Sequence, residues 1–349
     1  MNPLGRKLSG LKRRLSFLRP FGGKRAKLEP WLSLSLTLTL WLSFSLSLSA
    51  ARPKVALVLG GGGAKGGAEV GALKVIEQTG IKPDIIVGTS IGAIVGGLYA
   101  AGYTAAELES MFCEQEWLSL LTDRREDLSG EPYTEKNGVT YIFGFPVIDT
   151  NSSQFGLLGG GKVETVLDSM LNERGCARFE CLPVAFRCVA VELPSAEEVV
   201  LSQGSLSRAI RASMAIPGVF KPVVIDNRRL VDGGMMNNLP VDVARDMGAD
   251  IVIAIDLQQE KPRNKEQSSS PLTSIADFVG LGGIANWVFS RPDITKYNAN
   301  RQEADIYINP SLPDYEASSF GNENMRRMIT IGQKAALEQA PRLRALVSH

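Results

Sequence analysis

The stretch DIIVGTSIGAIVGGLYAAG (residues 84–102) decides the fold, because it joins a strand pattern to a helix pattern through a serine between glycines. DIIV is a short apolar run, as in a buried strand, and IGAIVGGLYAAG has the length and composition of a buried helix. Between them, GTSIG has the pattern G-x-S-x-G with Ser90 at its centre. A tight turn between strand and helix projects such a serine, so Ser90 is a candidate nucleophile. The alternative is that Ser90 caps the following helix.

The same alternation of strands and helices continues along the chain. VALVL (55–59) predicts a strand, and AEVGALKVIEQTG (68–80) predicts a helix that stops at its last glycine. Later segments repeat the two patterns: strands in LPVAFRCVAVEL (182–193), DIVIAIDL (250–257) and ADIYINP (304–310), and helices in LPVDVARDMGA (239–249) and NENMRRMITIGQKAALEQA (322–340). Strands that alternate with helices predict the α/β class, with a mostly parallel sheet covered on both faces.

A second glycine-rich element, GGGGAKG (60–66), also leaves an apolar strand and opens a helix. A P-loop needs Ser or Thr after its lysine, whereas Lys65 is followed by glycine. A dinucleotide fingerprint is formally present, but no acidic residue ends the next strand to bind a ribose. Backbone N–H groups of such a run also suit the oxygen of a substrate carbonyl beside Ser90, as acyl transfer requires. A plain anion-binding loop and a tight turn without further function stay open.

The base for Ser90 has to be something other than a histidine. The only histidine among 349 residues is His349, the last residue, where chain ends are usually frayed. A Ser-His-Asp triad is therefore set aside. A carboxylate that is hydrogen-bonded to the serine can accept its proton directly, so an acidic residue is the candidate base.

Asp232 is the candidate base, in the segment RRLVDGGMMNN (228–238). The preceding VVIDNRRLV predicts a hairpin that turns at Asn227, and the two glycines after Asp232 allow the backbone to bend sharply. The alternative is an aspartate that serves only the turn.

Taken in order, G-G-G-x-K-G (61–66), G-x-S-x-G (88–92) and D-G-G (232–234) resemble the three signatures of the patatin-like phospholipase family. Each motif alone is common, whereas their order and separations are specific. The stretches IRASMAIPGVFKPV and VDGGMMNNLPVDVARDMGAD add to the resemblance, which covers roughly residues 54–256. The later ADIYINPSLPDY and its helix resemble bacterial secreted members.

The resemblance implies a three-layer α/β/α fold with a mostly parallel central sheet and a nucleophile elbow. It also implies a Ser-Asp dyad, in which Ser90 is the nucleophile and Asp232 the general base. The implied oxyanion donors are the backbone N–H groups of Gly61, Gly62 and Gly63. To these we add the N–H of Ile91, the residue after the serine. The residues that support the motifs are Lys65, Gly66, Gly88, Gly92, Gly233 and Gly234. Where Lys65 stands the family often has Arg, so the charge is kept but planar bidentate contacts are lost.

The resemblance therefore implies a lipid acyl hydrolase of the phospholipase A or lysophospholipase type, working through an acyl-serine intermediate on phospholipid or other acyl esters at a membrane surface. Two alternatives stay open: a catalytically silent lipid-binding or interaction protein, and an acyltransferase that uses the same dyad. Two apolar stretches with tryptophan, 111–121 and 280–289, are candidates for an acyl channel or a membrane-facing lid, with core packing as the favoured alternative.

The N-terminal segment predicts export. Residues 1–30 hold nine Lys or Arg against one acidic residue, and residues 31–51, WLSLSLTLTLWLSFSLSLSAA, are uncharged. About twenty uncharged residues suffice to span a bilayer, and the small residues near position 50 suit a cleavage site. A cleaved signal and an uncleaved inner-membrane anchor stay open, with a disordered or mis-started leader as a third alternative. The first two place the globular part in the periplasm or outside the cell.

Composition narrows the partners and the domain organisation. Beyond residue 30 the chain holds 29 basic and 36 acidic residues, which gives no footprint for nucleic acid. With no C-x-x-C and no clustered histidines, we expect neither a metal nor a cofactor, and one or two disulfides or buried free thiols stay open for Cys113, Cys176, Cys181 and Cys188. The predicted parts are a leader (1–51), a catalytic domain (54–256), a mobile polar loop (257–271) and C-terminal elements that complete the domain (272–349).

Overall fold

An eight-stranded sheet organises the part of the chain that the computed structural model describes, residues 52–122, 134–136, 139–142, 145–146, 158–217, 219–259 and 294–347. Its strands are β1 (Val55–Leu59), β2 (Ile85–Thr89), β6 (Ala185–Glu192), β7 (Glu197–Leu201), β8 (Val223–Ile225), β9 (Arg228–Asp232), β10 (Ile251–Ile255) and β11 (Ile306–Ile308). The order is β11-β10-β1-β2-β6-β9-β8, with β7 also paired to β6. A separate antiparallel sheet contains β3 (Thr134–Lys136), β4 (Val139–Ile142) and β5 (Phe145–Pro146).

The large sheet is mostly parallel, as the sequence predicts. The strands β11, β10, β1, β2 and β6 run parallel to their neighbours. Only the β6 end of the sheet is antiparallel, where β7 and β9 pair with β6 and β8 pairs with β9. The hairpin between β8 and β9 turns through Asp226 and Asn227, which both have positive φ.

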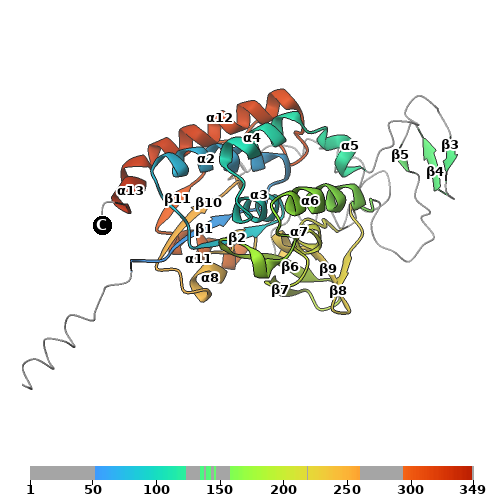
Figure 1. The fold of residues 1–349 in the computed structure, drawn as a ribbon, viewed down its shortest axis with the longest axis horizontal. Coiled ribbons are helices and arrows are strands. Elements are labelled where there is room, and N and C mark those ends of the chain that lie inside the picture. The colour runs from blue at the N-terminus through green and yellow to red at the C-terminus, as the bar shows by residue number, and fades with distance from the viewer. Residues whose placement is uncertain are drawn as a thin grey trace, which may run out of the picture. The chain divides into compact units, whose positions relative to one another are not determined.

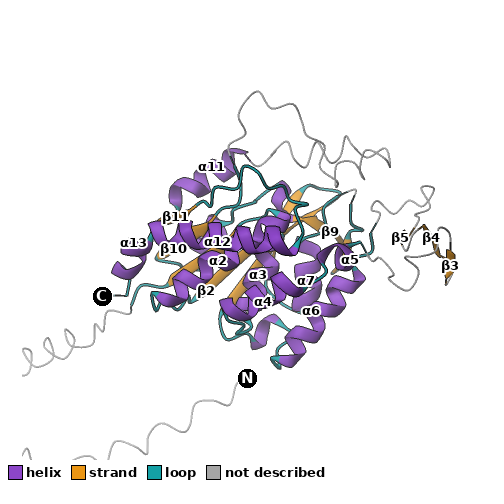
Figure 2. Ribbon diagram, turned by 90° about the horizontal axis from the view of Figure 1, so that it is seen from above, coloured by secondary structure: helices purple, strands orange, loops and turns teal. Residues whose placement is uncertain are grey.

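Helices cover both faces of the sheet, which makes three layers (Figures 1 and 2). One layer contains α2 (Gly66–Gln78), α3 (Ile91–Ala100), α4 (Ala105–Glu114), α5 (Trp117–Leu121), α6 (Gly161–Glu173), α7 (Leu206–Ser213), α12 (Asn322–Glu338) and α13 (Ala340–Ala345). The other contains α8 (Val241–Asp246) and α11 (Ile294–Glu303). Side chains of β1 alternate between the two cores: Leu57 and Leu59 pack toward α2 and α3, whereas Ala56 and Val58 pack toward α8.

Strands β2 and β9 meet end to end along one edge of β6. β2 pairs with the first part of β6, as far as Thr89 opposite Val189. β9 pairs with the last part in the opposite direction, from Asp232 opposite Ala190. Because β7 pairs with residues 188–192 from the other edge of β6, β2 and β9 share one edge and point their carboxyl ends at each other. The fold thereby brings Ser90, which follows Thr89, close to Asp232.

Several sequence predictions fall wholly or mostly on residues that the structure does not describe. The leader (1–51) and the tryptophan-containing stretch 280–289 lie outside the described residues, as does most of the predicted polar loop, of which residues 257–259 are described. Of the helices within the described ranges, none has both the length and the apolar character needed to cross a membrane.

The four cysteines divide into one disulfide and two thiols. Cys176 and Cys181 form a disulfide, with 5.5 Å between their Cα atoms. Cys113 and Cys188 are buried free thiols. Of the two possibilities that the sequence leaves open, each therefore holds for one pair.

The packing of α2 against α12 depends on glycines. A Cβ atom on Gly332 would lie 1.9 Å from the backbone oxygen of Ala68, and one on Gly71 would lie 1.9 Å from that of Ile329. Both contacts are with helix backbone, which cannot rotate out of the way. We therefore expect the two helices to separate if either glycine gains a side chain.

We predict that Gly332→Ala lowers the free energy of unfolding by about 2 kcal/mol or more, because overpacking a close contact costs roughly 1–3 kcal/mol. The melting temperature should fall by roughly 4–8 °C in a thermal denaturation experiment. Gly161→Ala is the matched control, since Gly161 begins helix α6 and a Cβ atom there meets nothing within 4 Å. Equal melting temperatures for the two variants would contradict the proposed packing.

Candidate active site

Ser90 lies in a sharp turn between β2 and α3. Its backbone has φ 57° and ψ −120°, a region that costs a residue with a side chain about 1–3 kcal/mol. The turn closes only around glycines: a Cβ atom on Gly88 would lie 2.2 Å from the oxygen of Gly92, and one on Gly92 would lie 2.4 Å from that of Leu59. This is the geometry of a nucleophile elbow, and it explains both glycines of the motif.

The Ser90 hydroxyl donates a hydrogen bond of 2.7 Å to Oδ2 of Asp232. The other carboxylate oxygen, Oδ1, accepts the N–H of Gly234 at 2.7 Å. The backbone N–H of Asp232 donates to the oxygen of Ala215 at 2.9 Å, which fixes the end of β9. Both side chains of the pair are buried, with 8% of Ser90 and 5% of Asp232 exposed, so little water competes for the contact.

Burial raises the pKa of the Asp232 carboxyl from its ordinary value of 3.8 to about 6. The hydrogen bonds from Ser90 and from the Gly234 N–H act in the opposite direction and hold the pKa below a still higher value. A carboxylate with a pKa near 6 is ionised at neutral pH and is a stronger base than an exposed aspartate. The site therefore has the acid-base property that serine activation needs.

Glycines also shape the turn after Asp232. The 3-10 helix η4 (Gly233–Met235) follows at once, and a Cβ atom on Gly233 would lie 2.2 Å from the oxygen of Val189. A Cβ atom on Gly234 would lie 2.6 Å from Oδ1 of Asn238. The tight turn brings the Gly234 N–H back to the Asp232 carboxylate.

Ser213, at the end of α7, fixes the backbone of the elbow. The N–H of Ser90 donates to the Ser213 hydroxyl at 2.9 Å, and this hydroxyl donates to the oxygen of Val189 at 2.6 Å. The Thr89 hydroxyl donates to the oxygen of Asn237 at 2.9 Å, which ties the elbow to the segment after Asp232. Ser213 lies within the IRASMAIPGVFKPV stretch, but nothing in the local sequence indicates its contact with Ser90.

The glycine loop lies beside Ser90, at the end of β1. A Cβ atom on Gly61 would lie 3.3 Å from that of Ser90. The N–H of Gly61 donates to the oxygen of Asn238 at 3.1 Å, so it is not available to a substrate. This departs from the prediction that Gly61 is an oxyanion donor. Within the described residues no backbone hydrogen bond engages the N–H groups of Gly62 and Gly63, and their role as oxyanion donors stays a prediction.

Ile91 begins α3 beside this loop. As a residue of the first helical turn, it has an N–H group without a partner inside the helix, and the positive end of the helix dipole lies at the same place. A Cβ atom on Gly66 would lie 2.3 Å from Cγ1 of Ile91, so Gly66 allows α2 and α3 to begin side by side. Lys65 lies in the 3-10 helix η1 (Gly63–Lys65) and is half-buried, and its anchoring role stays a prediction.

A second buried acid lies close to the glycine loop. Glu69, in the first turn of α2, is fully buried. Burial is the main cause that raises the pKa of its carboxyl well above 4.5, and the nearby charge of Asp256 is a smaller cause in the same direction. Burial therefore disfavours the charged form of Glu69. Among the described residues, no group of three or more His, Cys, Asp or Glu side chains is arranged to hold a metal ion.

An apolar pocket opens directly onto Ser90. Its volume is about 110 Å³, and it is lined by Gly63, Ser90, Ile91, Ile94, Trp117, Leu121, Thr122, Leu158, Met214, Ile216, Phe220, Ala317, Ser318 and Phe320. Trp117 packs between two other rings, with centroids 4.8 Å from Phe112 and 6.0 Å from Phe320. In the stretch 111–121, Trp117 is buried in the core, as the favoured alternative predicts, and it also lines this apolar pocket. An acyl-channel role for the stretch stays a prediction.

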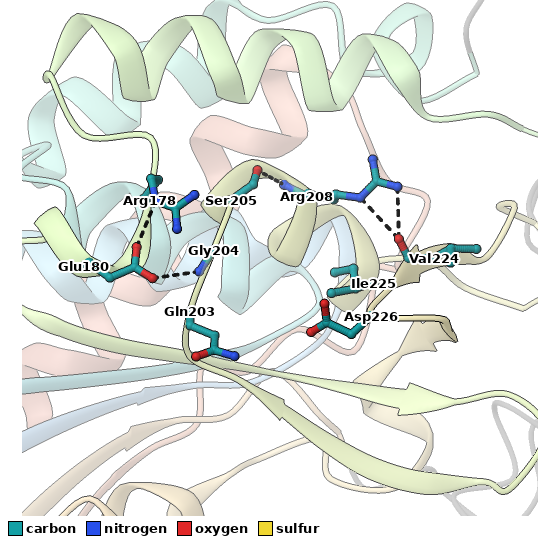
Figure 3. A pocket seen from close by; sticks show the side chains of 9 residues that line it. All are labelled: Arg178, Glu180, Gln203, Gly204, Ser205, Arg208, Val224, Ile225 and Asp226. Atoms are coloured by element: carbon teal, nitrogen blue, oxygen red, sulfur yellow. Dashed lines mark hydrogen bonds and ion pairs between the residues drawn. The ribbon is translucent and has the colours of Figure 1, made fainter.

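A larger pocket lies away from the Ser-Asp pair. It has a volume of about 430 Å³ and is lined mainly by polar residues between the start of α7 and the end of β8 (Figure 3). Arg208 donates to the oxygen of Val224, and Glu180 joins Arg178 to the N–H of Gly204. None of the predicted site residues lines this pocket, so we place the candidate active site at the smaller one, which contains Ser90.

Comparison with known proteins gives relatives that share only part of their length with this chain. An uncharacterized NTE family protein of Mycobacterium tuberculosis is 35% identical over 205 residues, which are 59% of this chain and 49% of the relative. Human patatin-like phospholipase domain-containing protein 6 is 33% identical over 205 residues, 58% of this chain and 13% of that protein. The crystal structure of VipD from Legionella pneumophila has 15% identity and a TM-score of 0.46, covering 84% of this chain and 67% of VipD.

The family model described as patatin-like phospholipase matches residues 57–245. The match contains the glycine loop, the elbow with Ser90 and the turn with Asp232, which are the three elements that the structure brings together. It also contains β2 and β6 to β9 of the large sheet, and β1 from Leu57 onward. This chain belongs to the patatin-like phospholipase family.

Proposed function

We propose that this protein hydrolyses fatty-acyl esters of lipids through an acyl-serine intermediate, with Ser90 as nucleophile and Asp232 as general base. The observation that carries the proposal is the buried hydrogen bond of 2.7 Å between the Ser90 hydroxyl and the Asp232 carboxylate. Membership of the patatin-like phospholipase family supports lipid hydrolysis as the reaction class. The mechanism and the phospholipase A or lysophospholipase type are the parts that experiments must test.

The first half of the proposed reaction forms the acyl-enzyme. Asp232 accepts the hydroxyl proton of Ser90 while Oγ attacks the ester carbonyl carbon. The negative charge that develops on the carbonyl oxygen is stabilised by the N–H groups of Gly62, Gly63 and Ile91. When the intermediate collapses, the ester bond breaks, the leaving alcohol takes the proton from Asp232, and the acyl group stays on Ser90.

The second half releases the fatty acid. Asp232, again ionised, accepts a proton from water, and the water oxygen attacks the acyl-serine carbonyl. Collapse of this second intermediate breaks the bond to Oγ, and Asp232 returns the proton to Ser90. An acyltransferase differs only in that an alcohol replaces the water, so both reactions share the first half.

The pocket supports an apolar acyl chain as the group that is bound. Its lining is almost entirely apolar, and at about 110 Å³ it is somewhat smaller than the roughly 150 Å³ cavities known to hold a benzene molecule. Part of a fatty-acyl chain next to the scissile ester fits such a space, with the rest extending outside. We extend the proposal to a membrane surface as the place of action and to export through residues 1–51, both on the strength of the sequence pattern.

The proposed function makes two predictions, of which one concerns the dyad. Ser90→Ala should lower ester hydrolysis by about 10⁴-fold or more, and Asp232→Asn by about 10³-fold or more, since nucleophile and base act as a unit. Initial rates on phosphatidylcholine, lysophosphatidylcholine and a p-nitrophenyl ester, with the full-length protein in detergent, measure both effects. Asp226→Asn is the matched control, because this exposed acid lies on the same hairpin and should leave the rates unchanged.

Three outcomes separate the alternatives. Activity that survives Asp232→Asn would mean that the base is misassigned. A folded but inert wild-type protein would favour the silent lipid-binding alternative. Transfer of the acyl group to an added alcohol in preference to water would identify an acyltransferase.

The second prediction concerns pH. The Asp232 carboxyl has a raised pKa of about 6 and acts as a base only when ionised, so kcat/KM should be constant above this pH and fall below it. The decrease should approach about tenfold per pH unit on the acid side. A profile of kcat/KM between pH 4 and 9, with a soluble ester and a check that the protein stays folded, measures it. A midpoint near 4 would mean that Asp232 behaves as an exposed acid and would contradict the role of burial.

A further inference from the structure

The backbone oxygen of Gly61 accepts hydrogen bonds from two side-chain amides. Nε2 of Gln258 donates to it at 2.9 Å, and Nδ2 of Asn238 donates to it at 3.2 Å. On the other side of the same residue, the Gly61 N–H donates to the backbone oxygen of Asn238 at 3.1 Å. Both polar groups of Gly61 are therefore held by residues at the carboxyl end of the sheet.

This arrangement fixes the direction of the next N–H group. A peptide unit is planar, and within a trans unit the C=O and the following N–H point in opposite directions. The described residues contain no cis peptide bond, so the Gly62 N–H points away from the two amides that hold the Gly61 oxygen. Fixing the oxygen therefore orients a proposed oxyanion donor.

Such a restraint is needed because the peptide unit lies between two glycines. Glycine reaches both signs of φ at little cost, so rotation of the unit between Gly61 and Gly62 meets little steric resistance from its own residues. A rotated unit would present its oxygen, instead of its N–H, to the developing negative charge. Two donors on the oxygen oppose this rotation, since it would leave both amides without their acceptor.

Gln258 is itself held by a buried polar network. Its backbone N–H donates to Oδ1 of Asp256 at 2.9 Å, and its backbone oxygen accepts from Nδ2 of Asn309 at 2.9 Å. Asp256 is fully buried, and its Oδ2 accepts the hydroxyl of Tyr307 at 2.6 Å and that of Tyr297. The end of β10 is thus rigid next to the end of β1, its parallel neighbour, where the glycine loop begins.

We propose that Gln258 and Asn238 are positioning residues that hold the peptide unit between Gly61 and Gly62 so that the Gly62 N–H stabilises the oxyanion. The inference rests on the proposed function, since it concerns the transition state of that reaction. Neither amide touches the reacting atoms; each acts through the Gly61 oxygen. A donor that is misaligned by loss of its support should weaken transition-state binding more than substrate binding.

The test replaces Gln258 with methionine, which has a similar shape and no amide. We expect kcat to fall by about 10- to 100-fold with KM changed by less than about threefold, because one oxyanion donor is worth ~10²- to 10³-fold and is here misaligned. Binding of a trifluoromethyl ketone, whose hydrate or serine adduct mimics the tetrahedral intermediate, should weaken by the same factor as kcat/KM. Gln258→Glu, which keeps the shape and reverses the polarity at one end, should lose at least as much.

Gln259→Met is the matched control. Gln259 is the next residue, and its side chain donates to the oxygen of Pro310 at 2.9 Å and accepts the N–H of Leu312 at 3.0 Å. It also donates to the backbone oxygen of Gln258 at 3.1 Å, which Asn309 holds as well, but it makes no hydrogen bond to the Gly61 oxygen. This variant removes the same amide from the same segment, so it should keep both kcat and the affinity for the ketone. Equal values for the Gln258 and Gln259 variants would overturn the proposal.

Hydrogen exchange measures the restraint without any turnover. In Gln258→Met, the amides of residues 60–63 should exchange faster than in Gln259→Met, because the loop has lost one of its supports. Equal exchange in the two variants would overturn the proposal even if the wild-type protein hydrolyses no ester. An inert wild type with faster exchange in Gln258→Met would instead mean that the restraint exists and the proposed hydrolysis is wrong.

Discussion

The hydrogen bond between Ser90 and Asp232 depends on one feature of the sheet, the end-to-end meeting of β2 and β9 along the same edge of β6. A parallel neighbour and an antiparallel neighbour occupy successive parts of one strand, so their carboxyl ends face each other. The elbow follows one of them, and the aspartate ends the other. The Ser90 hydroxyl and the Asp232 carboxylate, 142 positions apart in the sequence, are thereby placed 2.7 Å apart at the ends of two strands. In the proposed mechanism this direct pair transfers the proton without a histidine between the two side chains.

Around this pair, backbone segments approach one another closely at glycines, which have no side chain. Gly88, Gly92 and Gly233 each lie where a Cβ atom would overlap backbone, so the turns can pass within contact distance of one another. The cost is a strained serine and a glycine loop with much conformational freedom. Ser213 restrains the serine backbone, and the amides of Gln258 and Asn238 restrain the loop. Hydrogen bonds from distant segments thus supply the rigidity that the glycines themselves lack.

The sequence predicts the local elements well, because each is determined by neighbouring residues. The apolar run before Ser90, the glycines around it and the helix after it form a continuous pattern, and the hairpin at Asn227 follows from its turn residues. The contact between Ser90 and Asp232 is different: local sequence favours a turn aspartate, and only the family resemblance connects the two. The occupied N–H of Gly61 and the role of Gln258 are beyond sequence reasoning, because each depends on a segment distant in the sequence. The first needs the segment after Asp232 to lie beside the glycine loop, and the second needs β10 to lie beside β1. By its local sequence, a glutamine at the start of a polar segment reads as an ordinary loop residue, although its side chain donates a hydrogen bond to the glycine loop.

The most direct test of the dyad is covalent labelling with a long-chain alkyl fluorophosphonate, followed by peptide mapping by mass spectrometry. The serine oxygen displaces fluoride from phosphorus, so the label reports an activated nucleophile independently of the preferred lipid. We predict a single modified residue, Ser90, and a labelling rate that falls at least about tenfold in Asp232→Asn, because the base that removes the proton is lost. A folded wild-type protein that stays unlabelled, a label on another residue, or an unchanged rate in Asp232→Asn would contradict the proposed dyad.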